Sequence, residues 1–340
     1  MLREPRVTAA DVAKALGVSR STVSRAFSPD AYVKPATREK ILKTAKTLGY
    51  EPNAIAQALI SRRSNIVGII MGDLHNPFHA TIHSALTERL QAAGLIPLTA
   101  HLGPEKSIDD AVATFRQYQV GTVLLTSIVV SPDMVAACQE SGLRVALLNR
   151  IDESGHAASV CADLEQGGAL AAKHLVATGC RRIAIVEGLA GSWTTKARLA
   201  GHLRGLADAG LTPMAQLAGD YSYQAGVEAA SRLLSLYDPP DGVLCGNDLT
   251  AIGFLEESRT RFGIAAPRQI SVIGFDDIPM AAWRSFDLTT VRLPVRQMVD
   301  RVIDLLTRMV TSPEEILETT LVPCRLVERG TTTGVAPHTG

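Results

Sequence analysis

The chain has 340 residues, of which 46% are hydrophobic, and its 34 basic side chains balance 34 acidic ones. This length allows two or three domains with buried cores, and the composition excludes collagen-like and largely disordered proteins. No apolar run reaches the roughly eighteen residues of a membrane helix, and no apolar segment follows the N-terminal arginines as in a secretory signal. The five cysteines are scattered and lack C-x-x-C spacing. We therefore expect a soluble cytoplasmic protein with reduced thiols.

The zero net charge hides an uneven distribution along the chain. Residues 1–64 carry 12 Lys and Arg against 5 Asp and Glu, whereas residues 65–340 carry 22 against 29. A basic head on an acidic body is expected where only the head must neutralise phosphates. A chance cluster of surface lysines is the alternative.

The segment Thr8–Phe27 predicts two short helices around a tight turn. Thr8 and Asp11 fit a T-x-x-D capping box at the start of the first helix. Gly17 stands where that helix must stop, and Ser19 can cap the second helix. The outer face of the second helix is polar and holds Arg20, Ser21, Thr22, Ser24 and Arg25. The spacing of Ala13, Gly17 and Val23 is typical of a DNA-reading helix-turn-helix, with an ordinary surface helical hairpin as the alternative.

A third helix is predicted to begin at Pro35 and to end at Gly49. The apolar stripe that would close a three-helix core consists of Ala36, Ile41, Ala45 and Leu48. Residues 52–60 could form barely two helical turns, which is marginal without a packing partner. Residues 61–64, Ser-Arg-Arg-Ser, then resemble a basic linker. We expect a helical segment this short to become ordered only against DNA.

From residue 65 onward, apolar strands alternate with helices. The expected strands are 66–71, 96–100, 122–126, 144–148, 159–162, 182–187, 214–217, 242–245 and 271–274. The expected helices are 78–93, 107–117, 132–140, 166–178, 195–209, 223–236 and 248–260. Two such series of βαβ units predict two doubly wound lobes with parallel sheets, and ligands of such folds bind at the carboxyl ends of strands. Polar residues at those ends include Asp73, Asn76, Thr126, Asn149, Arg150, Asp163, Asn247, Asp248, Asp276 and Asp277.

From Val7 to about Arg329 the chain resembles the lactose-repressor (LacI/GalR) family of bacterial transcription regulators. The motifs that carry this resemblance are DVAKALGVSRSTVSRAF, VKPATREKI, LGYEPNAIAQAL, AAKHLVATGCRRIAIVEG, GNDLTAIGFLE and ISVIGFDDIPMAA. The resemblance implies an all-α, three-helix DNA-binding domain, a hinge helix with its linker, a two-lobed α/β domain like the periplasmic sugar-binding proteins, and a flexible tail. The corresponding ranges are 1–50, 51–64, 65–330 and 331–340. The N-lobe would comprise about 65–162 and 292–322, and the C-lobe about 163–291 and 323–330.

The resemblance also implies a homodimer on a palindromic operator, with one head on each half-site. The second helix would lie in the major groove, where Arg20, Ser21 and Arg25 would reach base edges. Leu59 matches the leucine that wedges into the minor groove at the operator centre and bends the duplex. Lys34 replaces a capping serine of many relatives, and its ammonium would contact a phosphate. The other expected DNA-binding residues are Thr8, Ser19, Thr22, Ser24, Asn53 and Ala56.

For the body, the resemblance implies a small polar effector, such as a sugar, in the cleft between the lobes. The expected effector-binding residues are Asp73, Asn76, Phe78, Thr126, Arg150, Arg198, Tyr221, Asn247 and Asp276. Arg198 and Asp276 are the strongest candidates. Tyr221, Trp283 and Phe286 could stack against a sugar ring, with core packing as the alternative for at least one of them. The tail lacks the leucine repeat of tetrameric relatives, so dimers are expected.

Other chemistries receive less support from the sequence. His75, His79 and His83 recur every four residues, but Asn76-Pro77 resembles a helix cap and puts His75 before the helix, so no metal is expected. His79 or His83 could instead face the cleft or the dimer partner. Asp276 and Asp277 could suggest paired catalytic carboxylates, yet adjacent side chains diverge and no partner base is evident. Phosphate-loop, dinucleotide-binding and nucleophile-elbow motifs are missing, so neither an enzyme nor a cofactor is expected.

The leading hypothesis is therefore a ligand-controlled transcription regulator that represses sugar or related carbon-source genes. The alternatives are a solute-binding protein for sugar transport and a co-repressor-dependent regulator of a non-sugar metabolite. The sequence leaves open the effector, the sign of its effect and the operator.

Overall fold

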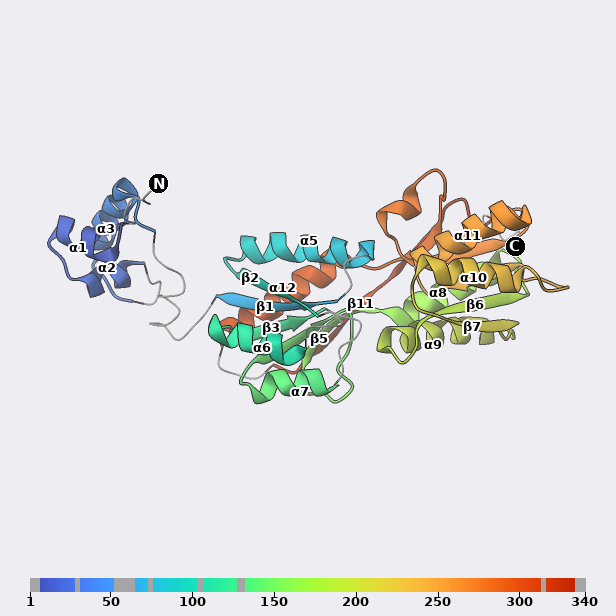
Figure 1. The fold of residues 1–340 in the computed structure, drawn as a ribbon, viewed down its shortest axis with the longest axis horizontal. Coiled ribbons are helices and arrows are strands. Elements are labelled where there is room, and N and C mark those ends of the chain that lie inside the picture. The colour runs from blue at the N-terminus through green and yellow to red at the C-terminus, as the bar shows by residue number, and fades with distance from the viewer. Residues whose placement is uncertain are drawn as a thin grey trace, which may run out of the picture.

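The computed structural model describes residues 7–27, 31–51, 65–72, 76–102, 107–126, 132–312 and 316–333. These residues form a three-helix head and a body of two α/β lobes, each built on one six-stranded sheet (Figure 1). The predicted three-helix head and two-lobed α/β body are confirmed, whereas the predicted hinge helix lies outside the described residues. In the described part of the chain, no helix is long and apolar enough to cross a membrane.

The head consists of α1 (Ala9–Leu16), α2 (Arg20–Ala26) and α3 (Pro35–Leu48). Asp11 Oδ2 accepts hydrogen bonds from the Thr8 amide at 2.8 Å and from the Thr8 hydroxyl at 2.7 Å, which confirms the predicted N-terminus of α1. Gly17 ends this helix with φ of 64°, a conformation that costs glycine little. Ser19 Oγ caps α2 by accepting from the Thr22 amide at 3.1 Å.

The head core includes only part of the apolar stripe predicted for the third helix. Its buried residues are Val12, Ala13, Val23, Ala26, Ile41 and Ala45. The prediction was wrong for Ala36, which is exposed because five residues separate it from Ile41 and place it roughly 140° around the helix. It was also wrong for Leu48, which lies in the last turn of α3 and is 39% exposed.

The N-lobe sheet is entirely parallel, with the strand order β11-β5-β4-β3-β1-β2. Its strands are β1 (Ile66–Met71), β2 (Ile96–His101), β3 (Thr122–Leu125), β4 (Arg144–Leu148), β5 (Ala158–Asp163) and β11 (Thr319–Pro323). One face is covered by α5 (Pro77–Ala92) and α12 (Val295–Thr311), and the other by α6 (Ile108–Gln117) and α7 (Pro132–Glu140). Near-continuous apolar strands such as IVGIIM suit a sheet that is buried on both faces.

The C-lobe sheet has the order β12-β10-β9-β8-β6-β7. Its strands are β6 (Ile183–Leu189), β7 (Ala215–Gly219), β8 (Gly242–Cys245), β9 (Ser271–Asp276), β10 (Thr289–Arg292) and β12 (Arg325–Val327). The helices are α8 (Leu164–Ala177), α9 (Trp193–Ala207), α10 (Tyr223–Leu233) and α11 (Asp248–Phe262), with the short 3₁₀ helix η1 (Pro279–Ala282). The expectation of a fully parallel sheet is corrected here, because β12 runs antiparallel to β10. The helices α8 and α9 lie on one side of the lobe and α10 and α11 on the other (Figure 1).

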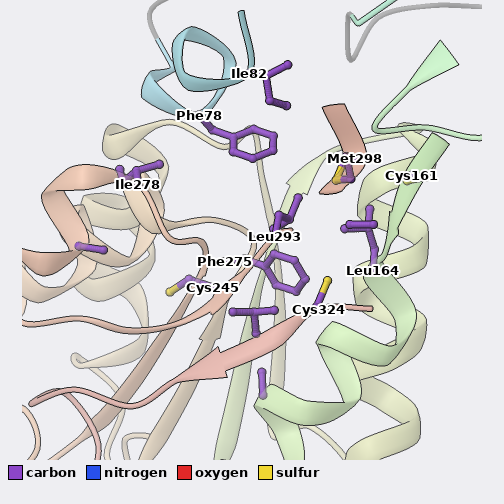
Figure 2. Close-up of a cluster of buried hydrophobic side chains, with 14 of the residues drawn as sticks. Phe78, Ile82, Cys161, Leu164, Cys245, Phe275, Ile278, Leu293, Met298 and Cys324 are labelled. Carbon is purple, nitrogen blue, oxygen red and sulfur yellow. The ribbon is translucent and has the colours of Figure 1, made fainter. Parts of the chain in front are cut away.

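The chain crosses between the lobes three times within a small region. It passes from β5 directly into α8 after Asp163, from β10 into α12 through residues 293–294, and from β11 into β12 through Cys324. Buried side chains of both lobes form one continuous cluster there, in which Figure 2 shows Leu293 near Phe78 and Phe275. These three crossovers are therefore the only covalent connections, within the described part of the body, about which the lobes could rotate.

The C-terminal end of the body extends further than expected. The predicted flexible tail begins at residue 331, but Thr331 and Thr332 are only 3% and 6% exposed. The Thr331 hydroxyl donates to the Val272 carbonyl at 2.7 Å, and the Thr332 hydroxyl bonds His174 Nε2 at 3.0 Å. The folded body thus includes these two residues, and residues 334–340 lie outside the described part.

Candidate effector site and DNA-reading face

The outer face of α2 presents two arginines and a serine to solvent. Arg20, Ser21 and Arg25 are all exposed, and Arg25 Nε donates to the Ser21 carbonyl at 3.3 Å. Both guanidinium groups carry donors that match the O6 and N7 acceptors of guanine. The face thus has the composition of a major-groove reader.

The neighbouring hydroxyl groups are partly engaged within the head. Ser19 Oγ lies 2.8 Å from Ser21 Oγ and 2.7 Å from Thr22 Oγ1, and Thr22 and Ser24 are half-buried. Lys34 is exposed at the start of α3 and makes no side-chain cap. The expected DNA contacts of Asn53, Ala56 and Leu59 lie outside the described residues.

A small cavity of about 10 Å³ lies between the lobes. Two N-lobe segments and four C-lobe segments contribute to its wall. The residues that line it are Asn76, Phe78, His79, Asn149, Thr194, Arg198, Tyr221, Asn247 and Asp276. Six of the predicted effector-binding residues are therefore brought together, namely Asn76, Phe78, Arg198, Tyr221, Asn247 and Asp276.

The other three predicted residues are not among the lining residues of this cavity. Thr126 is half-buried at the end of β3, where its hydroxyl donates to the Ile70 carbonyl at 3.1 Å. Arg150 is also half-buried, and burial lowers the pKa of its guanidinium. Asp73 lies outside the described residues. Trp283 and Phe286 stack on each other with centroids 6.4 Å apart and are not among the residues that line this cavity. Phe286 packs against the hydrophobic core, as the alternative had it, and stacking of either ring on a sugar stays a prediction.

The electrostatic centre of the cavity is an ion pair between Arg198 and Asp276. Arg198 Nη2 donates to Asp276 Oδ1 at 2.8 Å, and the two side chains are 6% and 3% exposed. Arg198 Nη1 donates to the Gly246 carbonyl, and the guanidinium lies 4.2 Å from the centroid of the Phe275 ring. Burial raises the pKa of Asp276 to about 6, against the opposing effect of Arg198. This pair offers both donors and an acceptor to a ligand.

Hydrogen bonds hold Asn247 and Tyr221 in place at the cavity wall. Asn247 caps α11, because its Oδ1 accepts from the Thr250 amide at 2.9 Å. Its Nδ2 donates to the Tyr221 carbonyl at 2.9 Å. The Tyr221 hydroxyl lies 2.7 Å from Thr195 Oγ1, and the ring packs against Gly188, where an added Cβ would lie only 1.9 Å from a ring carbon. Gly188 is therefore required by the position of the ring.

Unusual backbone conformations concentrate at this cavity. Among the described residues, six non-glycine residues have a positive φ, and three of them are the lining residues Asn149 (62°), Tyr221 (69°) and Asp276 (114°). A fourth is Asp277, with φ of 58°. Left-handed conformations of non-glycine residues persist where the surroundings force them, and they cluster at ligand sites.

The two residues Asp277 and Asp248 hold the loop that carries Asp276. Asp277 pairs with Arg292 at 2.5 Å and with Arg329 at 2.6 Å, so its carboxylate points away from that of Asp276, as expected. Asp248 Oδ2 accepts from the Ile278 amide at 2.8 Å. Complete burial raises the pKa of Asp248 well above its usual value.

Sequence reasoning missed one lining residue, Thr194. It lies in the first turn of α9, four residues before Arg198, and positions four apart share a helix face. Helical spacing from Arg198 could therefore have identified it. His79 lines the cavity, as one of the predicted alternatives had it, whereas His75 is outside the described residues. In the described part, no three His, Cys, Asp or Glu side chains group as metal ligands would.

Comparison with known proteins identifies both parts of the chain. Residues 8–53 match the family model for bacterial regulatory proteins of the lacI family, and residues 172–332 match a periplasmic binding protein-like domain. The catabolite control protein A of Priestia megaterium is 30% identical over 307 residues, which cover 89% of this chain and 92% of that protein.

Two solved structures extend the similarity to the three-dimensional arrangement. The lac repressor dimer bound to operator and the anti-inducer ONPF has 26% identity and a TM-score of 0.84, over 97% of this chain and 100% of that chain. The complex of the transcriptional regulator CelR with cellobiose has 27% identity and a TM-score of 0.73, over 96% and 100%. The chain therefore belongs to the lacI family of bacterial regulatory proteins.

Proposed function

We propose that the protein acts as a homodimeric repressor of sugar or related carbon-source genes, and that a small polar ligand between the lobes controls its affinity for an operator. The observation on which this proposal rests is the buried Arg198–Asp276 pair, which lines a polar cavity between the lobes. The same chain carries α2, whose exposed outer face holds Arg20 and Arg25. We further propose that it is a cytoplasmic protein without enzymatic activity or a cofactor.

The chemistry of the lining supports a polyhydroxylated ligand. Asp276 and Asn149 supply acceptor oxygens, Arg198 and Asn247 supply N–H donors, and the Phe78 ring supplies an apolar wall. The side-chain oxygen of Asn149 is buried and has no hydrogen-bond partner among the described residues. A buried acceptor without a partner is costly, so a ligand hydroxyl that donates to it would stabilise the complex.

A ligand larger than one water molecule fits this cavity only after the lobes move. A cavity of about 10 Å³ holds roughly one water molecule, whereas ligand pockets for larger molecules measure about 300–1,000 Å³. The wall combines segments of both lobes, and these lobes are joined at the three crossovers. Rotation about the crossovers would enlarge the cavity and at the same time reorient the N-lobe, whose β1 begins just after the proposed hinge segment, residues 51–64.

Such a rotation would change DNA affinity by shifting a population. A ligand that binds one lobe arrangement better than the other favours that arrangement in proportion to its differential affinity. The spacing of the two hinge segments in the dimer would then decide whether they fold on DNA. A ligand could release the operator as an inducer or tighten binding as a co-repressor, and the two differ only in which arrangement they prefer.

The test combines operator selection with a ligand screen on the purified full-length protein. We expect a random DNA library to yield an imperfect palindrome, and a panel of sugars and sugar acids to contain a compound that raises the melting temperature and changes operator affinity. Selection of a non-palindromic site would contradict the dimer. A compound that raises the melting temperature without changing operator affinity would contradict effector control.

A further inference from the structure

A second cavity, the rear cavity, lies behind the cavity between the lobes that is proposed to bind the effector (the effector cavity). Its volume is also about 10 Å³, and Arg198 and Tyr221 line both cavities, so these two side chains separate them. The rest of the rear cavity is formed by β6, α9 and the segment after β8. Its lining residues are Ile185, Val186, Glu187, Gly188, Thr195, Arg198, Leu199, His202, Tyr221 and Gly246.

Two polar atoms of residues that line this rear cavity are buried without a hydrogen-bond partner among the described residues. They are Nε of Arg198 and Nδ1 of His202, which belong to side chains 5% and 2% exposed. The other two nitrogens of the Arg198 guanidinium are bonded to Gly246 and Asp276. Burial of an unsatisfied polar group costs roughly 1–3 kcal/mol, so a native structure almost always provides a partner.

The protonation state of His202 makes these two atoms complementary. Burial, assisted by the neighbouring Arg198, lowers the pKa of His202 to about 3, so the ring is neutral at ordinary pH. A neutral imidazole has one nitrogen that donates and one that accepts, whereas Arg198 Nε only donates. One molecule that both accepts and donates can therefore satisfy Arg198 Nε and His202 Nδ1 together.

We propose that the rear cavity holds one ordered water molecule, which accepts a hydrogen bond from Arg198 Nε and donates one to His202 Nδ1. The volume fits, because about 10–15 Å³ accommodates one water and excludes a larger ligand. The Thr195 and Tyr221 side chains also line the cavity and carry hydroxyl groups that could complete its coordination.

This water makes His202 a positioning residue for Arg198. With Nη1 on Gly246, Nη2 on Asp276 and Nε on the water, every guanidinium nitrogen has a partner that fixes the plane of the group. The guanidinium then presents its remaining N–H groups to the effector cavity in one orientation. Preorganisation of this kind lowers the entropy that a ligand must remove on binding.

A matched pair of variants tests the proposal. His202→Asn places an amide roughly where Nδ1 lies and retains a polar partner, whereas His202→Leu is of similar size and has none. We expect a crystal structure of the full-length protein, at a resolution that shows ordered water, to contain density between Arg198 Nε and residue 202 in the wild type and in H202N but not in H202L. Absence of that density from the wild type would overturn the proposal.

Unfolding measurements provide a second test that needs no crystal. H202L should unfold at a lower urea concentration than H202N, with a roughly 5- to 100-fold lower ratio of folded to unfolded protein, because it leaves Arg198 Nε unsatisfied. In an Arg198→Lys background, which removes Nε, the two variants should unfold alike. Equal midpoints in the wild-type background, or an undiminished difference in the lysine background, would show that His202 acts through packing alone.

Discussion

Replacement of Gly201 by alanine probes how closely the helix that carries Arg198 must pack. A Cβ at this position of α9 would lie 2.1 Å from the carbonyl oxygen of Glu165 in α8 and 2.9 Å from the backbone nitrogen of Ala169. Carbon and carbonyl oxygen approach no closer than about 3.3 Å, so the helices would have to separate by more than roughly 1 Å. Both contacts are backbone atoms, and no side chain can rotate away to relieve them.

The expected cost is large for one methyl group. Overpacking costs typically about 1–3 kcal/mol, and we expect G201A to lie near 3 kcal/mol because the helix axes themselves must move. Urea unfolding followed by far-UV circular dichroism measures this cost. The matched control is Gly121→Ala, where an added Cβ meets no atom within 4 Å. This control should remain within about 1 kcal/mol of the wild type.

The same change tests the link from packing to function, because Arg198 lies three residues before Gly201 on α9. A displaced helix carries the guanidinium away from Asp276, so G201A should also weaken the response to the effector while the head still binds DNA. If G201A and G121A unfold at the same urea concentration, the reasoning about the α8–α9 contact is refuted.

Four further predictions concern the DNA-reading face, the hinge and the ion pair. Arg25→Ala should weaken specific operator binding by roughly 1–3 kcal/mol and non-specific binding much less, and equal losses in gel-shift titrations would reduce Arg25 to a phosphate contact. Leu59→Ala should reduce operator bending in a phasing assay, since a wedge is lost, and unchanged bending would count against it. Arg198→Ala should leave operator binding intact and abolish the ligand response, and a normal response would remove Arg198 from the site. Because burial raises the pKa of Asp276 to about 6 in the folded protein, its contribution to stability is greatest below about pH 4 and is lost as the pH rises through 6. The unfolding free energy of the wild type relative to Asp276→Asn should therefore fall by roughly 3 kcal/mol over this range, and an increase would contradict the assigned direction.

Local sequence signals predicted most of the elements because each had a local physical cause. Thr8 with Asp11, Gly17 and Ser19 set the ends of the head helices through caps that involve neighbours only a few residues away. The continuous apolar runs of the inner strands also predicted their positions, because a strand buried on both faces needs apolar residues at nearly every position. The antiparallel pairing of β12 had no such signal, because strand direction depends on where the chain returns from the other lobe.

The site was predicted less completely than the fold. Family motifs identified Arg198 and Asp276 as residues of the cavity. Whether Trp283 and Phe286 lie at the cavity depends on the course of the loop after η1, which no motif predicts. Thr126 and Arg150 follow strand ends as the lining residues do, yet side-chain direction at a strand end depends on backbone angles that no residue type dictates. The rear cavity was not predictable at all, since it arises from packing of α9 against β6 and the segments that carry Tyr221 and Gly246.

The adjacent residues Asp276 and Asp277 have a mechanical consequence. Both have a positive φ, and one carboxylate meets Arg198 at the effector cavity while the next meets Arg292 at the end of β10, immediately before a crossover. Two side chains on consecutive residues of a constrained backbone cannot move independently. A ligand that displaces the carboxylate of Asp276 would therefore also shift Asp277 and, through it, Arg292, the last residue of β10 before one of the three crossovers.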